Sequence, residues 1–222
     1  MGMLDWLFKK NHFKRAEDAF ALNREVLWDG LKNSIAHPTG QERDIWLIVH
    51  FMDRFTEVQE RLELWGLDYE IVSSKLVANE LERIRPNGTT SPAGLKLILA
   101  DLIPKQVELV ALPSRDADGE VAMIALERHP QVNHDDRVES FARSLPWRVE
   151  FGYFMALEDA VVKISIDDQV IEILQQLGLN NELISSKMVA RRLETVLRRL
   201  SSGFTGDTSC NSAEEWLEVN TP

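Results

Sequence analysis

A short, unbroken apolar run limits most strongly what this chain can fold into. Residues 45–51, IWLIVHF, are too few for a buried helix and have the length of a strand covered on both faces of a parallel sheet. Similar runs at 95–103, 106–112, 121–126 and 148–154 are predicted strands, and segments with helical spacing of apolar residues lie elsewhere in the chain. Strands that alternate with helices indicate an α/β domain with a mainly parallel sheet.

Composition excludes several classes of protein. The chain has 222 residues and a formal net charge of −11, which argues against a general nucleic-acid binder because such proteins need a basic surface. No apolar run approaches the roughly 20 residues that a membrane-spanning helix requires. The first 15 residues do not have the features of a secretory signal. A single cysteine, Cys210, excludes an internal disulfide, so we expect a reducing, cytoplasmic compartment.

The pattern along the chain predicts four parts. Residues 1–16 form an amphipathic N-terminal segment, 17–160 the α/β domain and 161–200 a C-terminal helical extension. Residues 201–222 are rich in Ser, Thr, Gly and Asn and contain four acidic residues, which predicts a flexible acidic tail. Within that tail, the AEEWLEV stretch carries Trp216, a side chain that would gain from docking against the domain.

One segment occurs twice. Residues 66–84, GLDYEIVSSKLVANELERI, and 178–196, GLNNELISSKMVARRLETV, are identical at ten of 19 aligned positions. The residues between the two copies do not repeat, so the similarity does not indicate a repeat architecture, and the sequence leaves open whether it reflects a duplication.

Three motifs in the second half of the chain occur in the order and spacing of a known family. They are E-R-H at 127–129, L-E-D at 157–159 and S-K-M-V-x-R at 186–191. Together they resemble the SecA preprotein translocase ATPase, at the end of its second RecA-like motor domain and the helices that follow. The resemblance implies a RecA-like, P-loop NTPase-type fold, with helices on both faces of a mainly parallel sheet and a C-terminal helical extension.

The departures from the SecA pattern fall on the nucleotide-binding elements. SecA carries G-R-S-G-R-Q-G-D after its E-R-H, and its arginines there reach the ATP phosphates, whereas residues 140–147 here read SFARSLPW. Arg143 is displaced from the expected positions, and Pro104 with its neighbours replaces a glycine-rich loop. The sequence also contains no G-x-x-x-x-G-K-[ST] phosphate cradle. We therefore expect no nucleotide cofactor and no ATPase activity.

A function without catalysis follows from these losses. The first hypothesis is a degenerate, stand-alone relative of the SecA motor domain that acts as a protein-binding or regulatory module linked to protein translocation. Aromatic and aliphatic residues replace cations and glycines on the face that would contact another motor domain, which suits a protein interface. A SecA-type motor, the translocation machinery and a second copy of the chain are the expected partners. The predicted interface residues are Phe141, Leu145, Pro146 and Trp147.

A histidine and aspartate cluster supports an alternative, a metal-dependent hydrolase. His129, His134, Asp135 and Asp136 offer imidazole and carboxylate groups suited to zinc, iron or manganese. Their spacing matches no catalytic zinc motif, and His129 belongs to the E-R-H element, so we favour a structural role. His50, at the end of a predicted strand, is interpreted as structural for a similar reason.

The N-terminal segment supports a third hypothesis, a peripheral membrane adaptor. Leu4, Trp6, Leu7 and Phe8 precede several basic residues, an order typical of segments that lie in a bilayer interface or dock on a partner. One such short segment would bind membranes only weakly.

Overall fold

The structure is a computed structural model of the chain. It describes residues 12–36, 43–86, 94–104, 119–176, 182–204 and 206–221. The N-terminal residues Leu4, Trp6, Leu7 and Phe8, and a strand predicted at 106–112, lie outside the described residues.

The described residues form an eight-stranded sheet whose centre is the apolar run seen in the sequence. Strand β3 is buried along its whole length and pairs in parallel with β5 on one side and β6 on the other. The order is β4-β5-β3-β6-β7-β2-β8, and β1 also pairs with β7. Among the strands that the structure describes, β2 and β8 are the one antiparallel pair. The strands are β1 (Phe13–Arg15), β2 (Ala19–Ala21), β3 (Asp44–Val49), β4 (Glu70–Val72), β5 (Leu95–Leu99), β6 (Glu120–Ala125), β7 (Arg148–Ala156) and β8 (Ile184–Ser185).

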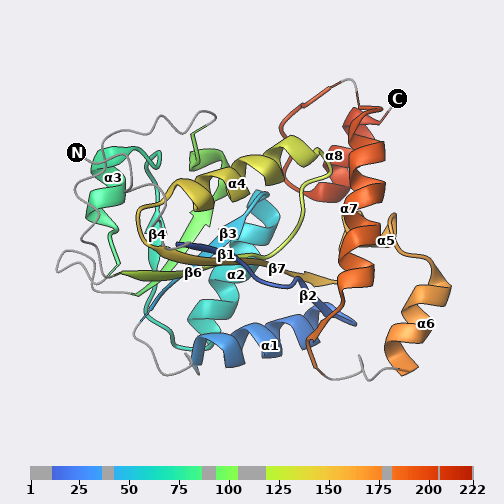
Figure 1. The fold of residues 1–222 in the computed structure, drawn as a ribbon, viewed down its shortest axis with the longest axis horizontal. Helices are drawn as coiled ribbons and strands as arrows, with labels where there is room; N and C mark the ends of the chain where they lie inside the picture. Colours follow the sequence, from blue (N-terminus) through green and yellow to red (C-terminus); the bar gives the residue numbers. More distant parts are fainter. Residues whose placement is uncertain are drawn as a thin grey trace, which may run out of the picture.

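Helices cover both faces of the sheet, as Figure 1 shows with α4 above it and α1 below it. Helices α1 (Arg24–Ala36) and α2 (Met52–Leu64) place their apolar residues in the core of one face. Helices α3 (Ala78–Arg83) and α4 (Val132–Ser144) pack on the opposite face, and a short 3-10 turn, η1 (Ala100–Leu102), follows β5. The predicted α/β class with a mainly parallel sheet is confirmed.

The chain continues from β7 into a helical extension, as predicted. It consists of α5 (Ala160–Lys163), α6 (Asp168–Gln176) and α7 (Lys187–Ser201). Helix α7 is strongly amphipathic, because Val189, Leu193 and Leu197 are buried while arginines occupy its other side. Burial of that apolar stripe attaches the extension to the domain.

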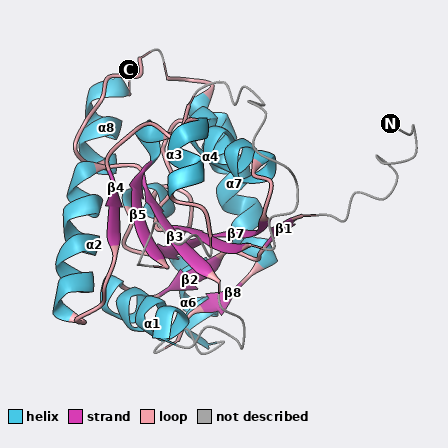
Figure 2. Cartoon of the chain, turned by 90° about the vertical axis from the view of Figure 1, so that its left-hand side faces the viewer, coloured by secondary structure: helices cyan, strands magenta, loops and turns pink. Residues whose placement is uncertain are grey.

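The prediction of a flexible tail is wrong for most of its length. Residues 206–221, here called the strap, pack on the domain and contain α8 (Ala213–Asn220). Trp216 is only 1% exposed and belongs to the main core. Burial of this large indole gives a favourable free energy of docking, which the polar composition of the segment does not reveal. Figure 2 shows α8 and α2 along the same side of the molecule.

The predicted protein interface is also corrected. Phe141, Leu145 and Trp147 are at most 4% exposed and lie in the main core, where Trp147 packs edge-on against Trp46 at 5.7 Å; Pro146 beside them is half-buried. Aromatic and aliphatic residues are present here because α4 and β7 close the core. This segment therefore offers no exposed docking face.

Among the described residues, no helix combines the length and apolarity that crossing a membrane demands.

Candidate functional site

The carboxyl ends of β3 and β6 form the candidate site. Helix α2 follows β3 on one face of the sheet, and α4 follows β6 on the other face. From β3 the chain continues to β4 at one edge of the sheet, whereas from β6 it continues to β7 in the other direction. Open α/β sheets bind ligands at such a switch point. His50 and Phe51 follow β3, whereas Glu127, Arg128 and His129 follow β6.

Glu127 occupies the beginning of α2. Its Oε1 accepts hydrogen bonds from the backbone N–H groups of His50 at 2.9 Å and Phe51 at 3.1 Å. Burial raises the pKa of the Glu127 carboxyl, while the charge of Arg54 opposes that rise. Backbone N–H groups at the beginning of a helix are a common binding site for phosphate. Here an acidic side chain of the protein takes that place.

Arg54 and Glu127 both line a cavity of about 410 Å³. The Arg54 guanidinium hydrogen-bonds Asp159 and Glu57, and its Nε lies 3.7 Å from Oε2 of Glu127. Burial disfavours the charged form of the Arg54 guanidinium and so lowers its pKa. Attraction to these carboxylates has the larger effect, and the pKa of Arg54 is raised. Asp159 also accepts a hydrogen bond from the N–H of Ala156 at 2.8 Å, so the network holds the end of β7. This arginine is fully paired within the protein.

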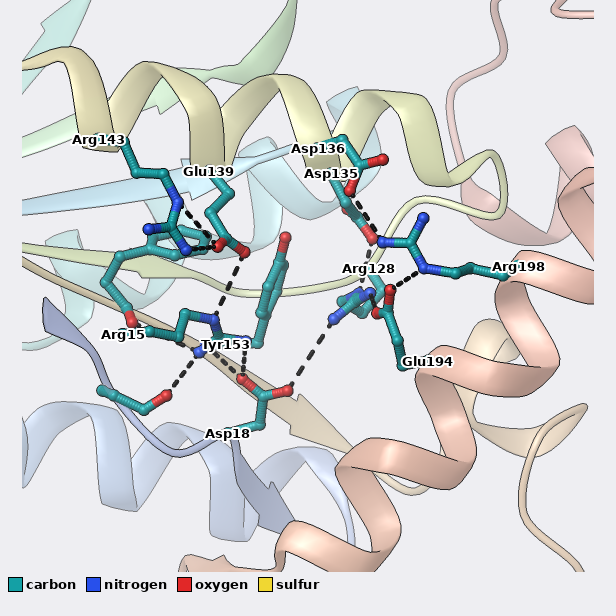
Figure 3. Close-up of polar contacts among 12 residues, drawn as sticks. Arg15, Asp18, Arg128, Asp135, Asp136, Glu139, Arg143, Tyr153, Glu194 and Arg198 are labelled. Carbon is teal, nitrogen blue, oxygen red and sulfur yellow. Dashed lines mark hydrogen bonds and ion pairs between the residues drawn. The ribbon is translucent and has the colours of Figure 1, made fainter. Parts of the chain in front are cut away.

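Arg128, the next residue after Glu127, makes a second network on the other face (Figure 3). Its Nε donates to Asp135 at 2.6 Å, a terminal nitrogen donates to Glu194 on α7, and its guanidinium lies 4.4 Å from the ring centre of Tyr153. Burial opposes ionisation of Asp135, but the Arg128 charge prevails and lowers the pKa of Asp135 to about 2. Arg128 therefore joins the sheet, α4 and α7.

Tyr153 stands between two guanidinium groups beside a cavity of about 480 Å³. Arg15 lies 5.1 Å from the ring centre on one side, and it also hydrogen-bonds Asp18 (Figure 3). Burial, reinforced by Asp135, raises the pKa of the Tyr153 hydroxyl well above its ordinary value. The phenol is therefore neutral at physiological pH.

Three histidines lie together at the carboxyl end of the sheet, beside a cavity of about 730 Å³. The ring of His129 stacks on His134 with centres 3.9 Å apart, and it packs edge-on against His50 at 5.4 Å. His50 Nε2 lies 3.0 Å from Oδ1 of Asp135. Burial, together with the neighbouring His50 and His134, lowers the pKa of His129 to about 2. His129 is thus an uncharged imidazole.

The predicted metal cluster does not assemble as the sequence suggested. Asp135 pairs with Arg128 and His50 and accepts a hydrogen bond from the backbone N–H of His129 at 3.0 Å, whereas Asp136 lies on the surface beside Arg198. Neither carboxylate is paired with the imidazole ring of His129 or His134. Instead the strap supplies Asp207, whose two carboxylate oxygens lie 3.0 and 2.9 Å from Nε2 of His134. Asp207 is 73 residues away from His134 in the chain, and no local pattern announces the contact.

His129, His134 and Asp207 offer potential ligand atoms within 4.8 Å of one another. The lone pair of an imidazole nitrogen lies in the ring plane, and the planes of His129 and His134 are nearly parallel, 16° apart. Stacked in this way, the two rings direct their lone pairs side by side and not toward one ion. Nδ1 of His129 also accepts a hydrogen bond from the N–H of Gln131 at 3.0 Å. The group is a hydrogen-bonded stack, and one ring would have to turn to bind a metal.

Comparison with known proteins finds a distant similarity to SecA. A SecA protein translocase subunit from Amoebophilus asiaticus is 24% identical over 144 residues, 64% of this chain, and one from Bacteroides fragilis is 20% identical over 150 residues, 67% of this chain. The chain is SecA-like. It matches only 13% of the length of either SecA relative, so it corresponds to a small part of those proteins. No family model matches the chain.

Among solved structures, the C-terminal part of the Fun30 ATPase domain aligns with 78% of this chain and 53% of its own. That alignment has a TM-score of 0.43 and 11% sequence identity.

Proposed function

We propose that this chain is a non-catalytic module with a degenerate RecA-like domain, which binds a protein partner in protein translocation. The observation that carries the proposal is the carboxylate of Glu127 at the beginning of α2, bonded to the N–H groups of His50 and Phe51. A phosphate group would need those donors and would meet a carboxylate already in place.

The charges around Glu127 support the same conclusion. The cavity at this position has three arginines and five acidic residues in its lining, and three of those acids, Glu57, Glu127 and Asp159, lie against the Arg54 guanidinium, so that cation is engaged within the protein. ATP-hydrolysing sites require the opposite arrangement, with cations free to contact the transferred phosphoryl group. The lining acids are Asp53, Glu57, Glu127, Asp159 and Glu214, and the arginines are Arg24, Arg54 and Arg128.

Arg143, the cation nearest in sequence to those of SecA, is engaged elsewhere. It hydrogen-bonds Glu139 on its own helix, and its guanidinium lies 4.1 Å from the ring centre of Phe13. It lies at the opposite end of α4 from the residues that follow β6. This placement supports the loss of the nucleotide site.

Calorimetry with millimolar Mg-ATP and Mg-ADP tests the nucleotide part of the proposal. We expect no binding heat and no rise in melting temperature, with a SecA protein measured in parallel as the positive control. Specific binding in the micromolar range would overturn the proposal. Glu127→Gln is the informative companion, because it keeps the shape of the side chain and removes the charge that opposes phosphate.

Binding to a SecA-type motor tests the partner. The purified chain, immobilised on a biosensor, is expected to bind purified SecA in a saturable manner and to show no response to an unrelated ATPase. Absence of binding to SecA, to other purified translocation components and to itself would contradict a protein-binding role. The SecA relatives supply the motive for this choice of partner.

A metal-dependent hydrolase is the second candidate, because His129, His134 and Asp207 lie close together. The stacking of the two rings disfavours it. Metal analysis of protein purified without chelator separates the candidates: the first predicts no stoichiometric zinc, iron or manganese. One equivalent of metal that is lost in His134→Ala would favour the hydrolase.

We place the module in the cytoplasm, in keeping with the free thiol of Cys210. Peripheral membrane contact through residues 4–8 is the further possibility that liposome flotation tests. Flotation that disappears on removal of those residues would support it.

A further inference from the structure

The strap, residues 206–221, lies over the carboxyl end of the sheet, and Trp216 is its most deeply buried side chain. Trp216 is 1% exposed, and its indole packs edge-on against His129 at 5.2 Å and Phe204 at 4.9 Å. His129 stacks in turn on Phe51. Trp216 is therefore the apolar anchor of the strap.

Two polar contacts fix the direction of the strap. Asp207 pairs with His134 on α4 at 2.9 Å, and the backbone carbonyl of Asn211 accepts a hydrogen bond from the N–H of Asp53 at 3.1 Å. Asp53 belongs to the first turn of α2, whose N–H groups have no partner within the helix. The strap thus bridges α4 and α2 across the ends of the strands.

The strap keeps its shape through its own hydrogen bonds. Oδ1 of Asn220 accepts from the N–H of Thr208 at 2.8 Å, which closes the loop before α8 onto the end of that helix. Ser212 caps α8 by accepting from the N–H of Glu215 at 3.1 Å, and the Glu215 carboxylate accepts from the N–H of Asn211 at 2.8 Å. These bonds are internal to the strap, so they shape the segment that docks on the domain and do not themselves attach it.

Removal of the strap would open a large surface. Asp207, Cys210 and Trp216 line the cavity of about 730 Å³ at the ends of β3 and β5. Ala213 and Glu214 line the cavity of about 410 Å³ around Arg54. Both cavities lie at the switch point of the sheet, and the strap contributes to the walls of each.

We propose that this edge of the sheet is a docking cleft for an acidic segment with a tryptophan anchor, filled by the chain's own strap and, in exchange, by the strap of a second copy. The proposal rests on the proposed function, since it names the surface and the partner of a protein-binding module. The contacts of the strap show which groups the cleft binds. The Trp216 indole packs against His129, the Asp207 carboxylate pairs with His134, and the Asn211 carbonyl accepts a hydrogen bond from the first turn of α2. A second copy presents the same groups in the same order, which makes exchange of this element a direct route to a dimer.

A labelled peptide of residues 203–222 tests the cleft. The full-length chain is titrated with it, and binding is followed by fluorescence anisotropy. A tethered strap competes at an effective concentration of about millimolar. We therefore expect the wild-type chain to bind the peptide at least tenfold more weakly than Trp216→Ala, whose own anchor is gone. Asn220→Ala removes hydrogen bonds that hold the strap in its seated shape and touches no residue of the cleft, so it is a second variant in case the first does not fold.

Two controls make the result specific. Val219→Ala changes a strap side chain that is 54% exposed and should bind the peptide as the wild type does. A peptide with Trp216→Ala should bind the opened variants at least tenfold more weakly. Folded variants, by circular dichroism, that show no saturable binding would overturn the cleft.

Exchange between copies is measured separately. Two wild-type preparations with different fluorophores should develop energy transfer as concentration rises, and Trp216→Ala in both should abolish it. Peptide binding without transfer would overturn the second copy as partner. Nucleotide calorimetry tests the proposed function independently of peptide binding. If the chain binds both Mg-ATP and the peptide, the non-catalytic function is rejected while the docking cleft still stands.

Discussion

The two copies of the repeated segment form the two edges of the sheet. Each gives a short strand followed by a helix: β4 with α3 in the first copy and β8 with α7 in the second. Strand β4 ends one side of the sheet, parallel to β5, and β8 ends the other, antiparallel to β2. Similar sequence therefore builds the same strand–helix unit at two positions with opposite strand direction.

The copies differ in where the helix begins, and the cause is tertiary. Helix α7 begins at Lys187, immediately after Ser186, which caps it by accepting from the N–H of Val189. The equivalent Lys75 remains outside α3, because the N–H of the next residue, Leu76, donates to the carbonyl of Leu102 at 2.9 Å. One backbone contact from a distant segment thus delays the helix. Local propensity is a weak determinant when a tertiary contact competes with it.

Because α3 begins later than α7, the buried and exposed positions of the two residues that follow the lysine are exchanged between the copies. In the first copy Leu76 is 1% exposed and Val77 is 51% exposed, whereas in the second Met188 is 58% exposed and Val189 is 1% exposed. The comparison makes matched predictions, because each buried residue has an exposed equivalent.

The largest effect is expected at Leu76. Leu76→Ala should lower the free energy of unfolding by about 3 kcal/mol, since it leaves a cavity in the main core. Met188→Ala, at the equivalent position, should change it by less than about 0.5 kcal/mol. Urea denaturation monitored by tryptophan fluorescence measures both. Equal losses at the two positions would show that the burial pattern is not reversed.

Val189→Ala should cost about 2 kcal/mol, because it removes two methyl groups from the buried stripe of α7. Val77→Ala should be nearly neutral. The same denaturation curves provide the measurement, and a loss at Val77 as large as that at Val189 would contradict the reversal.

A smaller difference is expected at the serines before each helix. Ser186→Ala should destabilise by about 1 kcal/mol through loss of the cap of α7. Ser74→Ala should have no effect, because the cap position of α3 is Val77 and makes no side-chain hydrogen bond. Thermal melts of the two variants decide the point; a similar drop for Ser74→Ala would mean that both serines cap.

The smallest effect is expected at Lys187, whose ammonium lies 3.0 Å from Glu17 on the surface. A double-mutant cycle of Lys187→Ala with Glu17→Ala should give a coupling of about 0.3 kcal/mol that falls in high salt. A coupling above about 1 kcal/mol, or one that is insensitive to salt, would show that this end of α7 is held by more than a solvated ion pair.

Much of the central fold could be predicted from the sequence. The run at 45–51 announces a strand buried on both faces, and β3 is such a strand. Strands β1, β2 and β8 have two or three residues each, too few for a periodic pattern, so they could not be found in this way.

The site was less predictable, because its contacts join distant parts of the chain. Glu127 and His129 could be placed at a strand end from the E-R-H motif, but the partners of Glu127 lie 77 and 76 residues away. Phe141 had a usable signal, since Val138, Phe141 and Ala142 have the spacing of one buried helix face. The polar composition of the strap predicted a flexible segment, but burial of the single Trp216 side chain is enough to dock it on the domain.

The position of the strap in the chain has a consequence for biosynthesis. Its residues, 206–221, are translated after all the strands and helices that they cover. Domains generally begin to fold in the order in which they are made. The residues of the histidine stack and of the first turn of α2 are therefore made before the strap, so the strap is the last part of the described fold that becomes available to cover them.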